Sequence, residues 1–380
     1  MYEKNDNLKI CFISLSAYPL LTGKDLAYTG GAEVQQVEIA KELKKRGYEI
    51  SFITYGADHD NENSFNEIPI FPAYDRNHVK DYGILKKAFF IYKKMKEVDA
   101  DIYYYHAGSP GVITLCAKLL KKRIVNHIAS DAQVTGESLI KKKLLINLLL
   151  KIGNLLDLKL SDIVVSQNEF QRSELKNRFN INSILIRNTF TIPLKEDIDR
   201  KPIYIIWIGT IYPIKQPSLF LKIPNHFPNY KFLMIGGSVD LEFYEKIKNA
   251  SKDIPNLEFK GFIPHNKIFD YYKKAILLIN TSKTEGFPNI FLEAWSCSIP
   301  VISLNINPDG IISKYKLGFH SKTFNKMLDD IKTLLEDKEL LETMGKNGRK
   351  YVEENHEISK IADQYENLME NLVKKIPKKN

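Results

Sequence analysis

The sequence is poor in cysteine and has no long apolar run, no repeat of solenoid length and no low-complexity tract. Its three cysteines, Cys11, Cys116 and Cys297, are widely separated and show no CxxC spacing, so they support neither a disulfide framework nor a zinc site. No apolar stretch approaches the ~20 residues of a membrane-spanning helix, and the polar segment MYEKNDNLKI lacks the apolar core of a signal peptide. We therefore expect a protein of the reducing cytoplasm that is neither exported nor integral to a membrane.

The composition is that of an ordinary globular chain. Hydrophobic residues make up 44% and charged residues 27% of the 380 residues, which excludes a largely disordered or collagen-like protein. This length suggests two or three domains, and two is our working number. The formal net charge of +9 favours phosphates, anionic lipid surfaces or nucleic acid as partners, but no nucleic-acid recognition motif accompanies it.

Alternating strand and helix patterns predict an α/β fold. The apolar run Leu8–Leu15 is followed by Ala32–Arg46, whose apolar residues recur at helical spacing, and Gly47 ends this helix before a second strand-like run. Further strands are predicted at residues 102–105, 124–127, 163–166 and 184–186, with helical stretches between them. Because strands joined through helices run parallel, we expect a doubly wound α/β domain.

The segment Asn188–Pro202 is typical of an interdomain linker, because prolines and a charged cluster interrupt the periodicity. Beyond it, the strand-like segments IYIIWIG, KFLMIGG, NLEFKGF, AILLIN and PVISLN alternate again with helical or loop stretches. From Thr323 onward the chain is mainly helical. We expect two Rossmann-like domains at 1–190 and 191–355, followed by a C-terminal helix and basic tail at 356–380.

Two adjacent glycines, Gly30 and Gly31, precede the helix that begins near Ala32. Glycine lets a phosphate approach backbone N–H groups at the positive end of a helix dipole, so a diphosphate is one candidate ligand here. Plain turn formation is the alternative, and the GxGxxG spacing of a dinucleotide fingerprint is absent. Spacing alone leaves both interpretations open.

Two glutamates bracket a predicted helix N-terminus in NTSKTEGFPNIFLEAWSCSIPVIS, residues 280–303. Glu285 lies in the loop after a strand, Pro288 is placed as a first-turn helix proline, and Glu293 lies further along the helix. Backbone N–H groups of residues 287–290 can bind phosphate, and the two carboxylates can accept hydrogen bonds from sugar hydroxyls, which suits a nucleotide sugar. The alternatives are an acidic first turn that complements the helix dipole and a glycosidase acid/nucleophile pair.

The segment EGFPNIFLEAWSCSIPVIS resembles the signature of the retaining glycosyltransferases of family 4, in which seven residues separate two glutamates, as they separate Glu285 and Glu293. GGAEVQQVEIAKELKKRGYEISFIT resembles that family's first glycine loop, helix and second strand. WIGTIYPIKQPSLFL, FLMIGG and LEFKGFIP resemble the first half of its nucleotide-binding domain, so the resemblance covers nearly the whole chain. It implies the GT-B fold, in which two Rossmann-like domains face a cleft, the first binding mainly the acceptor and the second mainly the nucleotide sugar. In that fold a C-terminal helix near Ile358–Leu372 crosses back onto the first domain.

The resemblance assigns roles to individual residues. Glu293 would hold the ribose hydroxyls of the nucleotide, Glu285 would contact the transferred sugar, and Lys215 would neutralise the leaving diphosphate. A fixed cation suits that place, because transfer through an oxocarbenium-like state builds negative charge on the departing phosphate. The residues expected to bind the nucleotide sugar are Gly30, Gly31, Gly209, Thr210, Phe287, Pro288, Asn289, Ile290 and Glu293.

One position departs from the family pattern. Many members place an arginine directly after the glycine of the strand that precedes Lys215, whereas this chain has Thr210 after Gly209. Either Lys215 and backbone N–H groups suffice for the diphosphate, or Arg187 or Lys283 substitutes, or activity is reduced.

His127 follows a strand at the place where family members often carry a cleft histidine beside the donor sugar. We assign it a role in orienting a hydroxyl or buffering a proton. His106, also at a strand end, is its competitor, and a hydrogen-bonded structural histidine is the alternative for each. No two histidines stand at HxH or HxxxH spacing, so we expect no metal site and a metal-independent reaction.

Two stretches, Lys86–Lys96 and Leu139–Leu160, combine lysines with bulky apolar residues. Helices of this kind can rest on an anionic membrane leaflet, and they can equally be core helices packed against a sheet. The sequence does not separate the two interpretations.

Taken together, the sequence predicts a GT-B hexosyltransferase that needs no cofactor beyond its nucleotide-diphosphate sugar donor. The acceptor is expected to be a glycan or a lipid-linked sugar, and transfer would proceed with retention, by front-face attack, to an α-linkage. Synthesis of a cell-surface polysaccharide is the expected setting, in the cytoplasm or peripherally on the inner face of the cell membrane. The alternatives are a non-catalytic nucleotide-sugar or glycan-binding protein, and an epimerase or phosphorylase on the same fold.

Overall fold

The computed structural model of the chain describes residues 8–22, 30–56, 64–75, 82–106, 111–135, 144–194, 200–238 and 240–374. Contacts within the chain divide it into two compact units, which we describe separately. The first unit comprises the described residues up to Thr189 together with those from Ile358 onward, and the second unit comprises Phe190–Glu357. The sequence-based boundaries fall at 190/191 and 355/356, and the roles assigned to the two domains stay predictions.

The first unit is built on a sheet of eight strands, with the bounds β1 (Lys9–Ile13), β2 (Glu49–Gly56), β3 (Ser64–Phe65), β4 (Ile68–Asp75), β5 (Ile102–His106), β6 (Arg123–His127), β7 (Ile163–Ser166) and β8 (Ile184–Leu185). Their spatial order is β3-β4-β2-β1-β5-β6-β7-β8, and every pair is parallel except β3 with β4. The helices of this unit are α1 (Tyr18–Thr22), α2 (Gly31–Lys45), α3 (Ile84–Val98), α4 (Val112–Leu119), α5 (Ala132–Thr135), α6 (Leu144–Leu160), α7 (Glu169–Phe179) and α15 (Ile358–Lys374).

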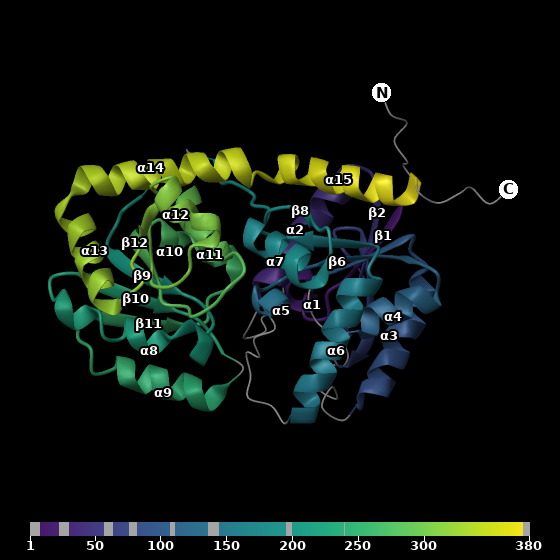
Figure 1. Cartoon of the computed structure of the whole chain (residues 1–380). Helices are drawn as coiled ribbons and strands as arrows, with labels where there is room; N and C mark the ends of the chain where they lie inside the picture. Colours follow the sequence, from purple (N-terminus) through teal and green to yellow (C-terminus); the bar gives the residue numbers. More distant parts are fainter. Residues whose placement is uncertain are drawn as a thin grey trace. The chain divides into compact units, whose positions relative to one another are not determined.

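Alternate residues of each strand face opposite sides of this sheet, as strand geometry requires. Ile10 and Phe12 belong to a buried cluster that includes residues of α2 and α15, whereas Cys11 and Ile13 belong to a cluster that includes residues of α3 and α4. Figure 1 shows α15 above the sheet and α3 and α4 below it. The expected doubly wound arrangement is confirmed for this unit.

The helix predicted at Ala32–Arg46 is confirmed as α2, and Gly47 follows it with a φ of 97°, the left-handed conformation that a helix-ending glycine supplies. Strands β3 and β4 were not predicted. Strand β4 (IPIFPAYD) contains Pro69 and Pro72, and proline weakens a strand prediction because it lacks a backbone donor. It is tolerated because β4 lies next to the sheet edge, which the two-residue strand β3 forms.

The C-terminal helix α15 completes the core of the first unit, although about 170 residues of the second unit precede it in the chain. Its residues Ile361, Tyr365, Met369 and Leu372 are buried in the same cluster as Ile10 and Phe12. Arg46, which caps the C-terminus of α2, reaches across to this helix. Its guanidinium pairs with Glu366 and lies 2.6 Å from Asp363, and it donates to the carbonyl of Ser359 at 2.7 Å.

A buried polar cluster lies beneath α15 at the carboxyl ends of β5 and β6. The hydroxyls of Tyr104 and Tyr365 lie 2.5 and 3.2 Å from Nδ1 of His127. The His127 ring stacks on the His106 ring with centroids 4.1 Å apart, and Nε2 of His106 lies 2.9 Å from the amide nitrogen of Gln167. Burial lowers the pKa of His106 to about 4 and lowers the pKa of His127 well below its usual value, so both rings are neutral at pH 7.

The second unit contains a sheet of six parallel strands, with the bounds β9 (Tyr204–Ile208), β10 (Lys231–Ile235), β11 (Leu257–Gly261), β12 (Ala275–Asn280), β13 (Val301–Ser303) and β14 (Gly318–His320). Their spatial order is β11-β10-β9-β12-β13-β14. The helices are α8 (Pro217–Phe220), α9 (Leu241–Ser251), α10 (Phe269–Tyr272), α11 (Asn289–Ser296), α12 (Ile311–Lys314), α13 (Phe324–Glu336) and α14 (Lys338–Asn355).

Two buried clusters again cover the two faces of this sheet. Ile206 and Leu278 pack in the cluster that contains Trp295 of α11, whereas Ile205 and Leu277 pack in the cluster that contains residues of α8, α9 and α13. The five strand-like segments predicted beyond residue 202 are confirmed as β9 to β13. Strand β14, which spans three residues, was not predicted.

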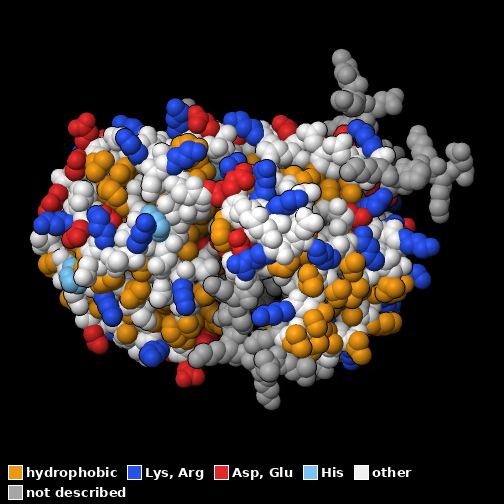
Figure 2. Space-filling view, in the orientation of Figure 1, with side chains coloured by type: hydrophobic (Ala, Val, Ile, Leu, Met, Phe, Trp, Pro, Cys, Tyr) orange, Lys and Arg blue, Asp and Glu red, His pale blue; other side chains and the backbone are white. Residues whose placement is uncertain are grey.

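The outward sides of α3, α4 and α6 carry many apolar side chains that remain exposed, as Figure 2 shows over these helices. No helix within the described ranges is both long and apolar enough to cross a membrane. Residues 139–143 of the predicted lysine–leucine stretch, and the basic tail at 375–380, lie outside the described residues.

The buried histidine pair predicts that acid weakens the first unit. In the unfolded chain a histidine takes up a proton near pH 6.5, whereas folded His106 does so only near pH 4. The unfolded state therefore binds more protons between these values, and folding stability falls as the pH falls, by ~2 kcal/mol for His106 alone between pH 7.5 and pH 5.

Urea unfolding followed by far-ultraviolet circular dichroism at these two pH values measures the effect, while fluorescence of the chain's two tryptophans, Trp207 and Trp295, reports the second unit. The variant His106→Gln should lose less stability on acidification than the wild type. His226→Gln, which changes an exposed ring of the second unit, is the matched control. An equal acid-induced loss of folding stability in His106→Gln and in the wild type would contradict the prediction.

Candidate functional site

The strand order of the second unit reverses between β9 and β12. The chain runs from β9 outward through β10 to β11, and then returns to the other side of β9 as β12. In open parallel sheets, the two loops that follow the strands at such a point run in different directions. The space between these loops leaves room for a ligand. Lys215 follows β9, and Glu285 follows β12, so the two predicted residues leave the sheet at this point.

Lys215 ends a short 3₁₀ turn, Pro213–Lys215, whose backbone is tied to the loop after β12. The hydroxyl of Thr281 donates to the carbonyl of Lys215 at 2.8 Å and accepts from the indole N–H of Trp207 at 2.9 Å. The N–H of Lys283 donates to the carbonyl of Ile214 at 2.8 Å. These bonds hold the two loops in register, so the position of the lysine is set by the backbone around it.

Lys215 and Glu285 form an ion pair in the structure. The ammonium lies 2.6 Å from Oε1 of Glu285, and the two side chains are 25% and 13% exposed. The hydroxyl of Ser282 donates to the same carboxylate oxygen at 2.7 Å, and the amide of Asn280 lies 3.2 Å from that hydroxyl. The structure therefore brings together a cation and a carboxylate that still face solvent.

Glu293 lies in the second turn of α11, and its side chain is only 7% exposed. The hydroxyl of Tyr272 donates to Oε2 at 2.6 Å, and Nε2 of His265 lies 3.5 Å from Oε1. Burial and the neighbouring carboxylate raise the pKa of Tyr272 well above its usual value, so this hydroxyl stays protonated and remains a donor. Glu293 is thus a buried carboxylate fixed by contacts with Tyr272 and His265, and it is not an acidic residue of an exposed first turn.

The N-terminus of α11 differs in one detail from the prediction. Pro288 is not a first-turn residue: its ψ of 120° is extended, so it stands at the N-cap position and Asn289 begins the helix. The carbonyl of Pro288 accepts from the N–H of Phe291 at 3.1 Å, and no side chain caps the helix. Phe287, directly before it, is buried with its ring centroid 5.0 Å from that of His356. Ile290 follows as the second helical residue and is partly buried.

Gly209 and Gly236 directly follow β9 and β10 and approach each other closely. A Cβ atom on Gly236 would lie 1.9 Å from the carbonyl oxygen of Gly209, so only glycine fits at position 236. Thr210, at the position where many family members carry arginine, follows in this tight segment. Of the two proposed substitutes, Lys283 is exposed in the same loop as Glu285, whereas Arg187 belongs to the first unit.

The remaining predicted residues belong to the first unit. Gly30 is the N-cap of α2, with no side-chain cap, and Gly31 is the first helical residue. Burial raises the pKa of Glu33 in the same turn. His127 is 2% exposed and has the contacts of a structural histidine, and its lowered pKa does not suit a proton buffer near pH 7. Its proposed contact with a donor hydroxyl stays a prediction, as does the diphosphate site at Gly30 and Gly31.

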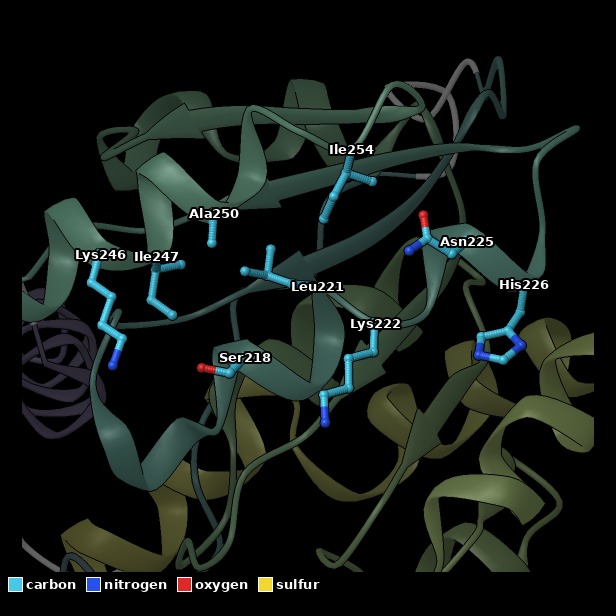
Figure 3. A pocket seen from close by; sticks show the side chains of 9 residues that line it. All are labelled: Ser218, Leu221, Lys222, Asn225, His226, Lys246, Ile247, Ala250 and Ile254. Atoms are coloured by element: carbon cyan, nitrogen blue, oxygen red, sulfur yellow. The ribbon is translucent and has the colours of Figure 1, made fainter.

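A hollow of about 500 Å³ lies elsewhere on the second unit, between the chain after α8 and the helix α9 (Figure 3). Leu221, Lys222, Lys246 and Ile247 are among its lining residues, and none of the predicted site residues lines it. These residues lie on segments that lead into β10 and β11, at the amino ends of those strands, where α/β sheets do not usually bind ligands.

Two residues of the site were missed from the sequence. Tyr272 and His265 contact Glu293 but precede it by 21 and 28 residues, on the other side of β12. No spacing rule connects such positions. Among the described residues, no group of three or more histidine, cysteine or acidic side chains is placed to hold a metal ion, and the metal-independence of the reaction stays a prediction.

Comparisons with known proteins identify the family of the chain. A family model described as Glycosyltransferase Family 4 matches residues 29–189, and one described as Glycosyl transferases group 1 matches residues 188–351. An uncharacterized glycosyltransferase of Haemophilus influenzae is 23% identical over 91% of this chain and 98% of its own length. The N-acetyl-alpha-D-glucosaminyl L-malate synthase of Bacillus anthracis is 23% identical over 94% of this chain and 96% of its own length.

Solved structures with the same fold include a sucrose-phosphate synthase from Thermosynechococcus elongatus, with a TM-score of 0.79, 17% identity, and coverage of 97% of this chain and 99% of that one. The HepE protein of Anabaena, in complex with UDP-glucose, gives a TM-score of 0.74 at 15% identity. The match covers 96% of this chain and 100% of the HepE chain. These likenesses confirm the predicted GT-B fold. Since the two family models together match residues 29–351, the chain belongs to the group 1 glycosyltransferases, with a first unit of the family 4 type.

Proposed function

We propose that this glycosyltransferase transfers a sugar from a nucleotide-diphosphate sugar with retention of configuration, using Lys215, Glu285 and Glu293 on the second unit. One observation carries the proposal: the Lys215–Glu285 pair lies on the loops of β9 and β12, where the strand order reverses, with Glu293 held in the following helix. The UDP-glucose bound to the Anabaena protein of the same fold supports the donor class.

Each of the three side chains suits one part of such a donor. The ammonium of Lys215 would pair with the diphosphate, where negative charge grows as the bond to the sugar breaks. Glu285 would accept hydrogen bonds from hydroxyls of the transferred sugar, and Glu293, more deeply buried, would accept them from the ribose. With Glu285 committed to the donor, front-face attack by the acceptor hydroxyl is the route to retention that we propose.

The acceptor in this proposal is a glycan or lipid-linked sugar, and the product is part of a cell-surface polysaccharide with an α-linkage. The reaction would need neither a metal ion nor a cofactor. The protein would act in the cytoplasm or against the inner face of the cell membrane. The excess of basic residues agrees with an anionic donor and an anionic surface.

The first experiment is a panel of nucleotide sugars scored by thermal shift and by release of nucleoside diphosphate. We expect one donor to stabilise the protein and to be hydrolysed slowly, and Glu285→Ala to abolish that hydrolysis. Glu245→Ala is the matched control, since Glu245 is an exposed carboxylate of the same unit that pairs with Lys248. If no donor stabilises the fold, the non-catalytic alternative replaces the proposal, and Thr210 is the first residue to test.

Lys215→Gln should lower kcat ~100-fold while the protein remains folded, because it removes the charge that stabilises the leaving diphosphate. Lys222→Gln changes an exposed lysine of the same unit and should leave kcat within about twofold, the size of an ordinary surface effect. Steady-state release of nucleoside diphosphate measures both. A Lys215→Gln enzyme with wild-type kcat would remove the lysine from the mechanism.

Tyr272→Phe should weaken nucleoside diphosphate binding ~10-fold with little change in kcat, because the tyrosine acts on the donor only by holding Glu293. Titration calorimetry with UDP and other nucleoside diphosphates measures the affinity, and Glu293→Gln should show a loss at least as large. Tyr271→Phe, at the adjacent position, is the control. Wild-type affinity in Tyr272→Phe and in Glu293→Gln would show that the ribose contact is wrongly assigned.

Product analysis separates the enzymatic alternatives. An epimerase would release no nucleotide, and a phosphorylase would require inorganic phosphate. Either result would retain the site residues and replace the reaction.

A further inference from the structure

The exposed large hydrophobic side chains of this protein are concentrated on one face of the first unit. Of the seventeen found among the described residues, eleven lie on α3, α4 and α6. We call this surface the α3–α4–α6 face, and its apolar residues are Ile84, Leu85, Phe89, Leu115, Leu119, Leu148, Leu149, Leu150, Ile152, Leu155 and Leu160. Single exposed leucines are ordinary on soluble proteins, but such a concentration marks an interaction surface.

Helices α3 and α4 each carry apolar side chains that are not packed against the sheet. On α3, Ile91 and Met95 are buried against the sheet, whereas Leu85 and Phe89, one turn apart, are 83% and 62% exposed. On α4, Leu119 is 73% exposed. Packing against the sheet therefore accounts for only one side of these helices.

The three helices form one fixed layer. Asp157 of α6 accepts from the N–H of Gly111 at 2.9 Å and from the hydroxyl of Thr114 at 2.6 Å, which ties α6 to the start of α4. The thiol of Cys116 on α4 lies 3.7 Å from the carbonyl of Ala88 on α3. The apolar side chains are thus presented by neighbouring, connected helices and not by a frayed end.

The charge of this layer is mostly positive. Over their described lengths, the three helices carry eight lysines against two acidic residues, Glu97 and Asp157. Asp157 is buried, and Glu97 pairs with Lys94 at 2.9 Å. Figure 2 shows blue side chains beside the orange area over these helices. Pairing this face with a second copy would bring lysines against lysines, whereas an anionic surface would neutralise them.

We propose that the α3–α4–α6 face binds an anionic phospholipid bilayer surface, with its leucines and Phe89 inserted among the acyl chains and its lysines among the headgroups. Apolar burial and attraction to anionic lipid are the two contributions that hold interfacial helices at a membrane. This inference gives the peripheral location in the proposed function a definite surface. Vesicle binding needs neither donor nor acceptor, so its outcome is separate from that of the transfer assays.

Flotation of the full chain with vesicles tests the proposal. We expect binding to vesicles that contain about one third phosphatidylglycerol in phosphatidylcholine, and binding at least ~10-fold weaker to phosphatidylcholine alone, because each lysine near an anionic surface contributes roughly fivefold. Raising the salt from about 0.1 to about 0.5 M should weaken the binding through screening. The double variant Phe89→Ser/Leu119→Ser should bind ~10-fold more weakly.

The matched control is Leu194→Ser/Leu241→Ser. Its two leucines are 67% and 72% exposed, close to the 62% and 73% of Phe89 and Leu119, but they belong to the second unit. It should bind vesicles as the wild type does. The proposal fails if the chain does not bind anionic vesicles, or if the two double variants lose binding equally. It also fails if the chain does not bind vesicles and sedimentation velocity shows a dimer that is lost in the Phe89→Ser/Leu119→Ser variant. The α3–α4–α6 face would then bind a second copy of the chain.

Discussion

Parallel pairing of β9 with β12 is the constraint on which the candidate site depends. Two neighbouring parallel strands end at the same edge of a sheet, so the loops that follow them start side by side although about 70 residues separate them in the chain. The reversal of strand order at this place gives the loops different directions, and bonds from Thr281 and Lys283 join them again at the backbone. Lys215 and Glu285 meet because of this geometry, and the pair needs no contact from the first unit.

The site residues that could be predicted are those whose positions follow from the spacing of nearby residues in the sequence. The seven residues between Glu285 and Glu293 place one carboxylate before a helix and the other inside it, and the structure has both there. Lys215 could be placed after a strand because β9 is a clear apolar run. The α/β class followed from alternating periodicities, and the GT-B arrangement followed from the family resemblance.

The remaining features depend on contacts that no local pattern encodes. Tyr272 reaches Glu293 only because α10 and α11 lie together against the same sheet. Pro288 has nearly the same φ as an N-cap or as a first-turn residue, so proline alone could not fix the helix start. The lysine–leucine stretches could pack against a core or rest on a membrane, and the structure shows that α3 has one side buried in the core and an opposite side that stays apolar and exposed. Membrane contact remains a proposal. Composition does not show which side of a helix faces the core, so only the folded structure distinguishes the buried side from the exposed side.

The return of α15 to the first unit has a consequence for the order of folding during synthesis. Domains generally fold as units while the chain emerges from its N-terminus. Here the first unit to be synthesised is the last to be completed, since Ile361, Tyr365 and Met369 of its core are translated after the whole second unit. Until then this face of the first sheet is covered by α2 without α15, and Ile10, Phe12 and Tyr104 are left partly uncovered. A nascent chain of this protein therefore carries an incomplete first unit and a finished second one until α15 has been made.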